Sequence, residues 1–412
     1  MISSSIMRSL TLIGRKWKPL IFPQKPFAQI ASSERIEEET FRDYVASRYY
    51  PTHIGEVLRD RYQVVGKLGY GASSTVWLAR DLSGKRHVVL KLFITSSSLG
   101  KHLDDEINIY RRLKKQTQVH PGRDAVRQLL DTFDIEGPDG QHRCLVHPPL
   151  WESALSFLHR NPIGRLPVPV LAFTLRRLFQ ALDFLHSECR VIHTDIKADN
   201  IMFGIQDYDV FRKYEQLELQ EPSPRKVLDD RTSYTSRDLS PPKQWGAPVL
   251  CDFGSAALGD AEHTEDIQPD IYRAPEVILG IPWSYEVDIW NTGCMVWDLF
   301  EGGHLFTGHD PEVHRYRSRS HLAEMIALLG SPPLELLAQG AVSDHFFAKD
   351  GTLHADIPRP DAVSLEHRED SLIGSEDRQL FLRFMSKMLQ WEPSKRHSAK
   401  ALAEDEWIRK NT

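Results

Sequence analysis

The order of hydrophobic patterns along the chain most constrains its fold. Short runs rich in β-branched residues, separated by glycine-containing turns, cover residues 62–68, 74–80 and 87–93, and such runs predict antiparallel strands. Between Leu103 and Leu113 the apolar residues recur at steps of three and four, which is the period of a helix. After Val146 the periodic segments are mostly helical. This order predicts an α+β fold with a small antiparallel-sheet part that has one main helix, and a larger, mostly helical part.

The chain of 412 residues is long enough for two or three domains. We expect an N-terminal extension over residues 1–52, the sheet-rich part over 53–147 and the helical part over 148–412. Residues 206–247 interrupt the helical part with alternating charges and several prolines. This composition predicts an inserted loop.

Residues 1–33 carry several basic residues and no acidic one. That bias resembles a mitochondrial transit peptide. The alternative is a disordered basic tail, because Pro19, Pro23 and Pro26 would break a long amphipathic helix. From Arg35 to Asp60 the chain becomes acidic and aromatic, which favours a lead-in that packs on the following domain.

Charge and cysteine content exclude several classes of protein. The net charge of −6 gives no general attraction to nucleic acid or to an acidic membrane surface. The four cysteines have no CxxC spacing, which favours a reducing compartment. No run approaches the roughly 20 apolar residues of a membrane-spanning helix. We therefore expect no direct nucleic-acid partner and no membrane partner.

The turn between the first two predicted strands is rich in glycine. Residues 68–76 have the sequence LGYGASSTV, in which two glycines let backbone amides approach anionic oxygens without a Cβ in the way. The turn lies between strands and does not open a helix, so it favours a flap over nucleotide phosphates above a dinucleotide-binding unit. Taken alone, such a turn is often only structural, and Ser74 occupies the place of a third glycine.

A lysine follows in the middle of an apolar strand. Burying the Lys91 ammonium without a partner would cost several kcal/mol. Glu106, on the predicted helix, is the natural carboxylate partner, and the pair would orient the ammonium toward phosphate oxygens. In isolation, Lys91 could equally be an edge-strand lysine that reaches solvent.

The strongest local signal is the sequence VIHTDIKADNI over residues 191–201, followed 52 residues after Asn200 by Asp252-Phe253-Gly254. These segments resemble the catalytic loop and the metal-binding turn of the eukaryotic protein kinases. The resemblance implies the bilobal protein-kinase fold, ATP and Mg²⁺ as cofactors, and a protein substrate. His193 is then expected to pack and to donate hydrogen bonds, because Asp195 occupies the position of the base.

The resemblance also implies a role for each matching residue. Asp195 would orient the substrate hydroxyl and accept its proton, Lys197 would steady the transferring phosphate, and Asn200 and Asp252 would supply oxygen ligands to Mg²⁺. Lys91, paired with Glu106, would hold the α- and β-phosphates, and adenine would use the carbonyl of Pro148 and the amide of Leu150. The residues expected around the nucleotide are Leu68, Gly69, Gly71, Ala72, Ser73, Ser74, Val76, Lys91 and Leu150.

Three features downstream match structural positions of a kinase. Tyr272-Arg273-Ala274-Pro275-Glu276 resembles the end of an activation segment, and Arg396 matches the arginine that pairs with that glutamate. Asp288 opens a helix that would anchor the catalytic loop, and Trp290 would belong to the core. Thr194 stands where most kinases carry an arginine, so no cation is available there to bind a phosphorylated activation segment.

Within the kinases, the chain is similar to the CMGC group and resembles a divergent, fungal-type member of the SR-protein kinase family. The likeness rests on residues 54–56, 62–71, 193–197, 266–268 and 321–330 and on an insert between catalytic loop and metal-binding turn. Two departures are Phe253 for the family's leucine and Pro269-Asp270-Ile271 for its Thr-Arg-Gln. Acidic residues between Asp252 and Glu276 favour an arginine–serine-rich substrate, although an acidic face is often only solvated.

The expected function is therefore a serine/threonine protein kinase that transfers the γ-phosphate of ATP to Ser or Thr hydroxyls of proteins. The alternative is a catalytically silent pseudokinase scaffold, for which Ser74, the two hinge prolines and the insert are the hints. A small-molecule phosphotransferase would lack the segment from Tyr272 to Glu276. We expect a monomer located in cytoplasm and nucleus, with the mitochondrion as the alternative suggested by the basic N-terminus.

Overall fold

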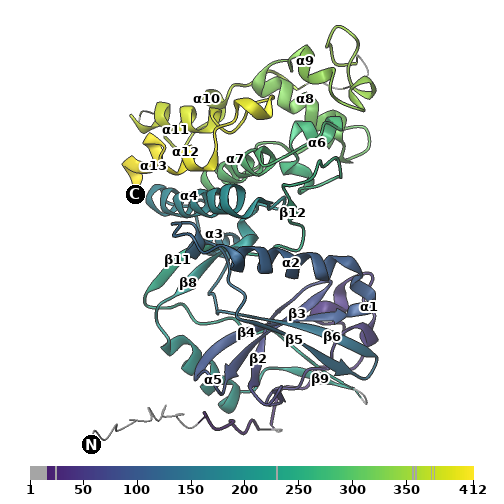
Figure 1. The fold of residues 1–412 in the computed structure, drawn as a ribbon, viewed down its shortest axis with the longest axis vertical. Helices are drawn as coiled ribbons and strands as arrows, with labels where there is room; N and C mark the ends of the chain where they lie inside the picture. The colour runs from purple at the N-terminus through teal and green to yellow at the C-terminus, as the bar shows by residue number, and fades with distance from the viewer. Residues whose placement is uncertain are drawn as a thin grey trace, which may run out of the picture. The chain divides into compact units, whose positions relative to one another are not determined.

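The computed structural model describes residues 16–23, 26–228, 231–354, 357, 360–372, 374 and 376–412. Two compact units form, each from three stretches of chain (Figure 1). Unit 1 comprises Met1–Ser98, Leu129–Pro149 and Tyr208–Ser240, and unit 2 comprises Leu99–Gln128, Leu150–Asp207 and Pro241–Thr412. The predicted division at residue 147 differs from these units in two places, because 99–128 group with unit 2 and 208–240 with unit 1.

Unit 1 is built on a six-stranded antiparallel sheet with the order β1-β2-β3-β4-β6-β5. Its strands are β1 (Val57–Leu58), β2 (Tyr62–Tyr70), β3 (Ser74–Asp81), β4 (Arg86–Thr95), β5 (Asp131–Gly137) and β6 (Gly140–His147). The three predicted strands are confirmed as β2, β3 and β4. Alternate residues of these strands point to one face, where Trp77, Val88, Leu90 and Val146 form a core with almost no solvent exposure.

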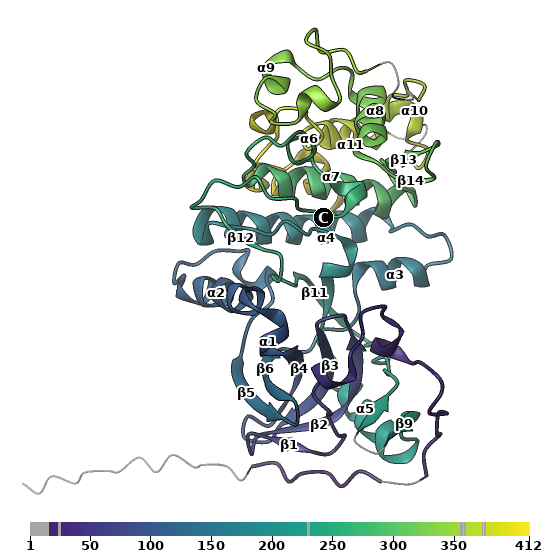
Figure 2. The same cartoon turned by 90° about the vertical axis from the view of Figure 1, so that its right-hand side faces the viewer.

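The insert is not a loop, so this prediction was wrong. It contains α5 (Asp209–Gln220) and an antiparallel hairpin of β9 (Arg225–Val227) and β10 (Thr232–Tyr234). Val210, Phe211 and Tyr214 form one buried face of α5, which contacts β2, and both ribbon views place α5 beside this strand (Figure 2). Pro222 and Pro224 lie between α5 and β9, and Pro241 and Pro242 lie in the connection after β10, so none of these prolines interrupts a helix or strand.

The N-terminal extension also has structure in its described part, so the expectation of disorder was wrong there. The Trp17 amide donates to the Leu82 carbonyl at 2.9 Å, and the Leu20 amide donates to Gln63 at 2.8 Å. Short 3₁₀ turns follow at Glu37–Thr40 and Ala46–Arg48, and the predicted lead-in over 35–60 is confirmed to pack on the sheet. Residues 1–15, 24 and 25, which carry much of the transit-peptide prediction, lie outside the described residues.

Unit 2 is mostly helical. Its helices are α2 (Lys101–Lys115), α3 (Ala154–Arg160), α4 (Val168–Asp183), α6 (Pro275–Leu279), α7 (Glu286–Glu301), α8 (Ser318–Leu329), α9 (Leu334–Leu337), α10 (Leu365–Arg368), α11 (Asp377–Ser386), α12 (Ala399–Ala403) and α13 (Glu406–Asn411), and α1 (Ser96–Leu99) precedes α2. Its strand pairs are β7 (Val191–Ile192) with β12 (Ala257–Leu258), β8 (Ile201–Ile205) with β11 (Trp245–Leu250), and β13 (His309–Asp310) with β14 (Arg315–Tyr316). The helix predicted between Leu103 and Leu113 is confirmed as α2.

Helix α7 lies in the core of unit 2, and its residues from Val287 to Val296 are all buried. Trp290 is fully buried, as predicted, and stacks on Phe306 with ring centroids 5.9 Å apart. Polar groups of a buried helix need partners within the protein, and the Asp288 carboxylate and the Asn291 amide oxygen find theirs in the catalytic loop described below. Within the described ranges, no helix combines the length and the apolar character needed to cross a membrane.

Candidate active site

The catalytic-loop residues of unit 2 converge on one carboxylate. Lys197 Nζ lies 2.8 Å from Asp195 Oδ2, and Asn200 donates from Nδ2 to the same oxygen at 3.0 Å and to the Asp195 carbonyl at 2.9 Å. Asp195 and Lys197 are half-buried, whereas Asn200 is buried. The three predicted residues are thus brought together, and Oδ1 of Asp195 remains as the atom that can face a hydroxyl.

Two side chains near the start of α7 bind the backbone amides of this loop. Asp288 Oδ2 accepts from the His193 amide and Oδ1 accepts from the Thr194 amide, both at 2.8 Å. Asn291 Oδ1 accepts from the Ile196 amide, also at 2.8 Å. The predicted anchoring role of Asp288 is confirmed, whereas Asn291 was missed. Its signal was an amide side chain three residues after Asp288, on the same face of an otherwise apolar helix.

The loop includes a residue in an unusual backbone conformation. Thr194 has a φ of 66°, a conformation that β-branched residues rarely adopt. The hydrogen bonds of its amide and of its hydroxyl hold it in this conformation. Its hydroxyl donates to the Ser255 carbonyl at 2.7 Å. This position therefore ties the catalytic loop to the segment after Gly254 and offers no cation to a phosphate group.

The predicted metal ligands lie side by side. The Cys251 amide donates to the Asn200 carbonyl at 2.7 Å, which places Asp252 next to Asn200. Asp252 has a φ of 64° and an exposed side chain. Because the amide nitrogen of Asn200 binds Asp195, its amide oxygen is left as a ligand, and carboxylate and amide oxygens are what Mg²⁺ prefers. These donors fit a magnesium ion whose other ligands come from phosphate and water.

The turn from Asp252 to Gly254 is packed against α2 and the catalytic loop. Phe253 is fully buried between His193, at a ring distance of 5.4 Å, and Tyr110, at 5.3 Å. His193 donates from Nε2 to the Cys251 carbonyl at 3.0 Å. This bond holds two segments of the chain together, as expected for a packing residue. A Cβ built on Gly254 would lie 3.7 Å from Glu106 Oε2, so α2 brings Glu106 to this turn.

In unit 1, the glycine-rich turn joins β2 to β3. A Cβ added to Gly69 would meet no atom within 4 Å, and one on Gly71 would meet only the Ser74 carbonyl at 3.8 Å. Neither glycine has a positive φ. Packing and backbone conformation therefore do not require glycine at either position, whereas close approach of a phosphate would. Both glycines are therefore compatible with the phosphate-binding flap predicted for this turn.

The other nucleotide residues of unit 1 follow on the neighbouring strands. Lys91 on β4 pairs in register with Val76 on β3, and its Nζ lies 4.8 Å from the centre of the Phe93 ring. Leu150, of unit 2, has a buried side chain. The pairing of Lys91 with Glu106 and the binding of adenine by Pro148 and Leu150 stay predictions, because each joins residues of different units.

A cavity of about 870 Å³ opens beside Asp195 within unit 2. Thr194, Lys197, Gln268 and Pro269 contribute to its wall, and Asp105 and Asp266 add carboxylates. The structural role of Gln268 was not predicted from the sequence. Its φ is 73°, and its side chain donates to the Val287 carbonyl at 2.7 Å and accepts from the Ala274 amide at 2.8 Å. It thereby fixes the wall of the cavity to α7.

The acidic residues of the segment from Asp252 to Glu276 are largely paired within the chain. Asp260 binds Arg112 at 2.6 Å, and Arg273 binds Asp266 at 3.1 Å and Asp270 at 3.0 Å. The Arg112 guanidinium lowers the pKa of Asp260. A cationic ligand would therefore have to share these carboxylates with arginines of the chain.

The end of this segment is held by a buried ion pair. Arg396 donates to Glu276 through two nitrogens, at 2.6 and 2.7 Å, and both side chains are fully buried. Arg396 also donates to the Glu286 carbonyl at 3.0 Å. The predicted structural pair is confirmed. Removing one partner of such a pair is strongly destabilising, because the other charge is left buried.

Comparison with known proteins agrees with this geometry. A family model described as protein kinase domain matches residues 62–227 and 239–408. A serine/threonine protein kinase of Aspergillus fumigatus is 43% identical over 386 residues, which covers 93% of each chain. The serine/threonine-protein kinase SRPK of Physarum polycephalum is 29% identical, covering 88% of this chain and 89% of its own. SRSF protein kinase 3 of Mus musculus is 26% identical, covering 92% of each.

These matches cover most of the chain and include the catalytic loop, the metal-binding turn and the Glu276–Arg396 pair. None of these matches favours a catalytically silent scaffold, and the residues predicted for phosphoryl transfer in unit 2, Asp195, Lys197, Asn200 and Asp252, lie in two neighbouring segments. Kinases of this family use ATP and a divalent metal ion. The chain belongs to the protein kinase family and is a serine/threonine protein kinase similar to the SR-protein kinases.

Proposed function

We propose that this kinase transfers the γ-phosphate of Mg²⁺-ATP to serine or threonine hydroxyls in arginine-rich segments of proteins. The observation that carries the proposal is the cavity beside Asp195, whose wall includes the carboxylates of Asp105 and Asp266. Relatives named SRSF protein kinase and SRPK support the same substrate class. Arginine next to the acceptor would meet these carboxylates, which recognise a guanidinium through paired hydrogen bonds.

Each active-site residue of the chain has a separate role in the phosphoryl transfer. Asp195 uses Oδ2 to hold Lys197 and Asn200, so its Oδ1 is free to accept the hydrogen bond of the acceptor hydroxyl and then its proton. Lys197 places a positive charge beside the same carboxylate, where it neutralises charge on the transferring group. Asn200 and Asp252 would hold Mg²⁺, which supplies charge neutralisation of the phosphate oxygens when bound.

Asp266 is the residue that best tests the substrate class. Its side chain is 76% exposed and lies 3.1 Å from Arg273. One carboxylate oxygen thus remains open to solvent, and an incoming arginine would share the carboxylate with Arg273. An exposed ion pair of this kind contributes little to stability, so its removal tests recognition without unfolding the protein.

The experiment compares three peptides that differ only beside the acceptor, with Arg-Ser, Lys-Ser or Ala-Ser repeats. We expect kcat/KM to be highest for Arg-Ser, and Asp266→Asn to lower it about threefold to tenfold for that peptide alone, the factor of one exposed charge-assisted contact. Glu335→Gln, which removes an exposed carboxylate on α9, is the matched control. Equal kcat/KM values for the three peptides would contradict the substrate class.

We further propose that the kinase acts as a monomer in the cytoplasm and nucleus, without direct contact to nucleic acid. The net charge of −6 supports the last point. The alternative location is the mitochondrion, suggested by the basic residues 1–33. A fluorescent fusion with and without residues 1–15 tests the location. Loss of a mitochondrial signal on truncation would overturn the proposal.

A further inference from the structure

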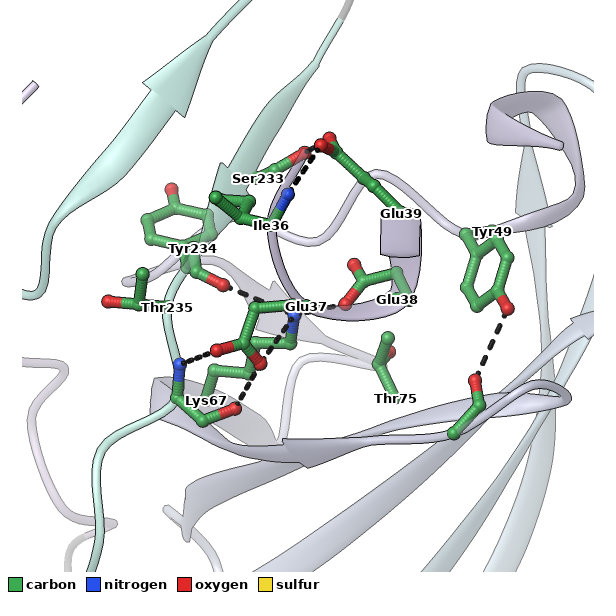
Figure 3. Close-up of polar contacts among 12 residues, drawn as sticks. Ile36, Glu37, Glu38, Glu39, Tyr49, Lys67, Thr75, Ser233, Tyr234 and Thr235 are labelled. Carbon is green, nitrogen blue, oxygen red and sulfur yellow. Dashed lines mark hydrogen bonds and ion pairs between the residues drawn. The ribbon is translucent and has the colours of Figure 1, made fainter. Parts of the chain in front are cut away.

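The glycine-rich turn is bound by a residue that precedes the kinase-domain match, which begins at residue 62. Tyr49 donates its hydroxyl to the Ala72 carbonyl at 2.8 Å and lies 3.2 Å from the Gly71 carbonyl (Figure 3). Its side chain is buried, and burial raises its pKa to about 12. The hydroxyl therefore keeps its proton at neutral pH and acts as a donor.

Peptide geometry turns this contact into an orientation of the phosphate-binding amides. In a trans peptide the C=O and the N–H of the same peptide plane point in opposite directions. The carbonyls of Gly71 and Ala72 share their planes with the amides of Ala72 and Ser73. Both carbonyls point toward Tyr49. The two amides therefore point to the opposite side of the turn, where they can donate hydrogen bonds to an anion.

Tyr49 belongs to a segment that is itself firmly bound. We call residues 34–50 the N-terminal strut. In its 3₁₀ turn three consecutive glutamates bind groups of the sheet and the insert: Glu37 accepts from the Ser236 hydroxyl at 2.6 Å, Glu38 pairs with Lys67, and Glu39 pairs with Lys226. Figure 3 shows Glu38 facing Lys67, and Glu39 facing Ser233. Glu38, Glu39, Lys67 and Lys226 are buried. The strut therefore has a fixed position between the insert and the sheet.

The strut and the insert also hold the strand that leads into the turn. Lys67, two residues before Gly69, donates to the Tyr234 carbonyl at 3.1 Å. Its own carbonyl accepts from the Tyr214 hydroxyl and from the Arg237 amide, both at 2.9 Å. At the turn itself, the rings of Phe41 and Tyr70 lie 5.8 Å apart. The strut and the insert thus contact the end of β2, at Lys67 and Tyr70, where the strand enters the turn.

We propose that Tyr49 is a positioning residue for ATP, which acts through the backbone of the glycine-rich turn and not by touching the nucleotide. The strut then contributes to ATP binding and is not only an extension of the chain. The inference requires the kinase activity alone and is independent of the arginine-rich substrate, since any peptide that is phosphorylated can report it.

The test uses the full chain with Tyr49→Phe, which keeps the ring and removes only the hydroxyl. We expect KM for ATP to rise about threefold to tenfold, the factor that corresponds to one lost hydrogen bond. The values of kcat and of KM for the peptide should stay within about twofold, because the catalytic loop is in another unit. The Kd for MgADP, measured by calorimetry, should rise by the same factor as KM for ATP.

Tyr50→Phe is the matched control, because it removes a neighbouring hydroxyl that faces Glu56 at 3.5 Å and not the turn. The proposal is overturned if Tyr49→Phe and Tyr50→Phe have the same KM for ATP, or if Tyr49→Phe lowers kcat without changing that KM. Should Tyr49→Phe unfold, Phe41→Leu carries the test. It removes the ring beside Tyr70, and an unchanged KM for ATP would contradict the proposal.

Discussion

The catalytic loop of unit 2 and the glycine-rich turn of unit 1 are held in different ways. The catalytic loop is held by Asp288 and Asn291, two residues of α7 whose side chains bind backbone amides inside the matched kinase domain. The glycine-rich turn is held by Tyr49 of the N-terminal strut, and the strut is itself fixed by its three glutamates, all of which precede that match.

This difference separates anchors that lie inside the kinase-domain match from anchors that lie before it. The anchors of the catalytic loop are buried and hold the backbone on both sides of Asp195, so they should affect the chemical step. The anchors of the glycine-rich turn act on the backbone of a loop that meets the nucleotide, so they should affect nucleotide affinity and the stability of unit 1. Each prediction below tests one side of this division.

Among the variants that compare the two regions, the largest effect is expected from a group that would contact the phosphates directly. Lys91→Ala should lower kcat/KM about 10² to 10³-fold, the usual cost of removing one positioned electrostatic group. Steady-state kinetics on the folded variant measures this. Lys114→Ala, which removes an exposed lysine from α2, should change nothing. Activity of Lys91→Ala within a few-fold of wild type would remove Lys91 from the site.

The anchor of the catalytic loop should act on kcat. Asp288→Asn keeps the shape but leaves one of the amides of His193 and Thr194 without an acceptor, so we expect kcat to fall about tenfold to a hundredfold through misplacement of Asp195. KM for ATP should change little. Glu286→Gln, on the same turn of α7, is the control. If Asp288→Asn raised KM for ATP and left kcat intact, the division between the two regions would be wrong.

The strut should contribute to stability. Glu38→Gln leaves the Lys67 ammonium, which is 1% exposed, with weaker partners, and we expect the free energy of unfolding to fall by about 2 kcal/mol. Denaturant unfolding measures the loss. Glu34→Gln, an exposed glutamate of the same strut, should stay within about 0.5 kcal/mol of wild type. Equal stability of the two variants would show that the buried pair does not hold the strut.

The last prediction concerns the pH dependence of stability. Burial raises the pKa of Glu56, after the strut, to about 7 from its usual 4.5. The folded protein then binds this proton more tightly than the unfolded chain, so the contribution to stability is complete below about pH 4.5 and is lost as the pH rises to about 7. Glu56→Gln should flatten the stability curve between these values, whereas Glu34→Gln should not. An unchanged slope would mean that Glu56 ionises normally.

Much of the catalytic side could be predicted from the sequence. Asp195, Lys197, Asn200 and Asp252 lie in short segments whose spacing fixes their relation, and the structure brings the loop residues and the metal-binding turn together. The link between Glu276 and Arg396 spans 120 residues and was predictable only through the resemblance. Local spacing and a known pattern together therefore account for this side.

The glycine-rich side could be predicted less well, for a physical reason. Glu37, Glu38 and Glu39 look like a solvated acidic run, because the sequence does not reveal that Lys67, Lys226 and Ser236 will face them. The insert was expected to be a loop because its charges and prolines hide the buried face of α5. Partners far apart in the chain, each in a polar segment, leave no periodic signal.

The central claim is that the carboxylate of Asp195, held by Lys197 and Asn200, acts on the hydroxyl that receives the phosphate. The most direct test is transfer of labelled phosphate from ATP to a serine peptide by the wild-type chain and by Asp195→Asn. We predict a fall in kcat of about 10² to 10⁴-fold for the variant, the range of a lost general base, with an unchanged Kd for MgADP. Equal rates of phosphate incorporation by the two proteins would contradict the account.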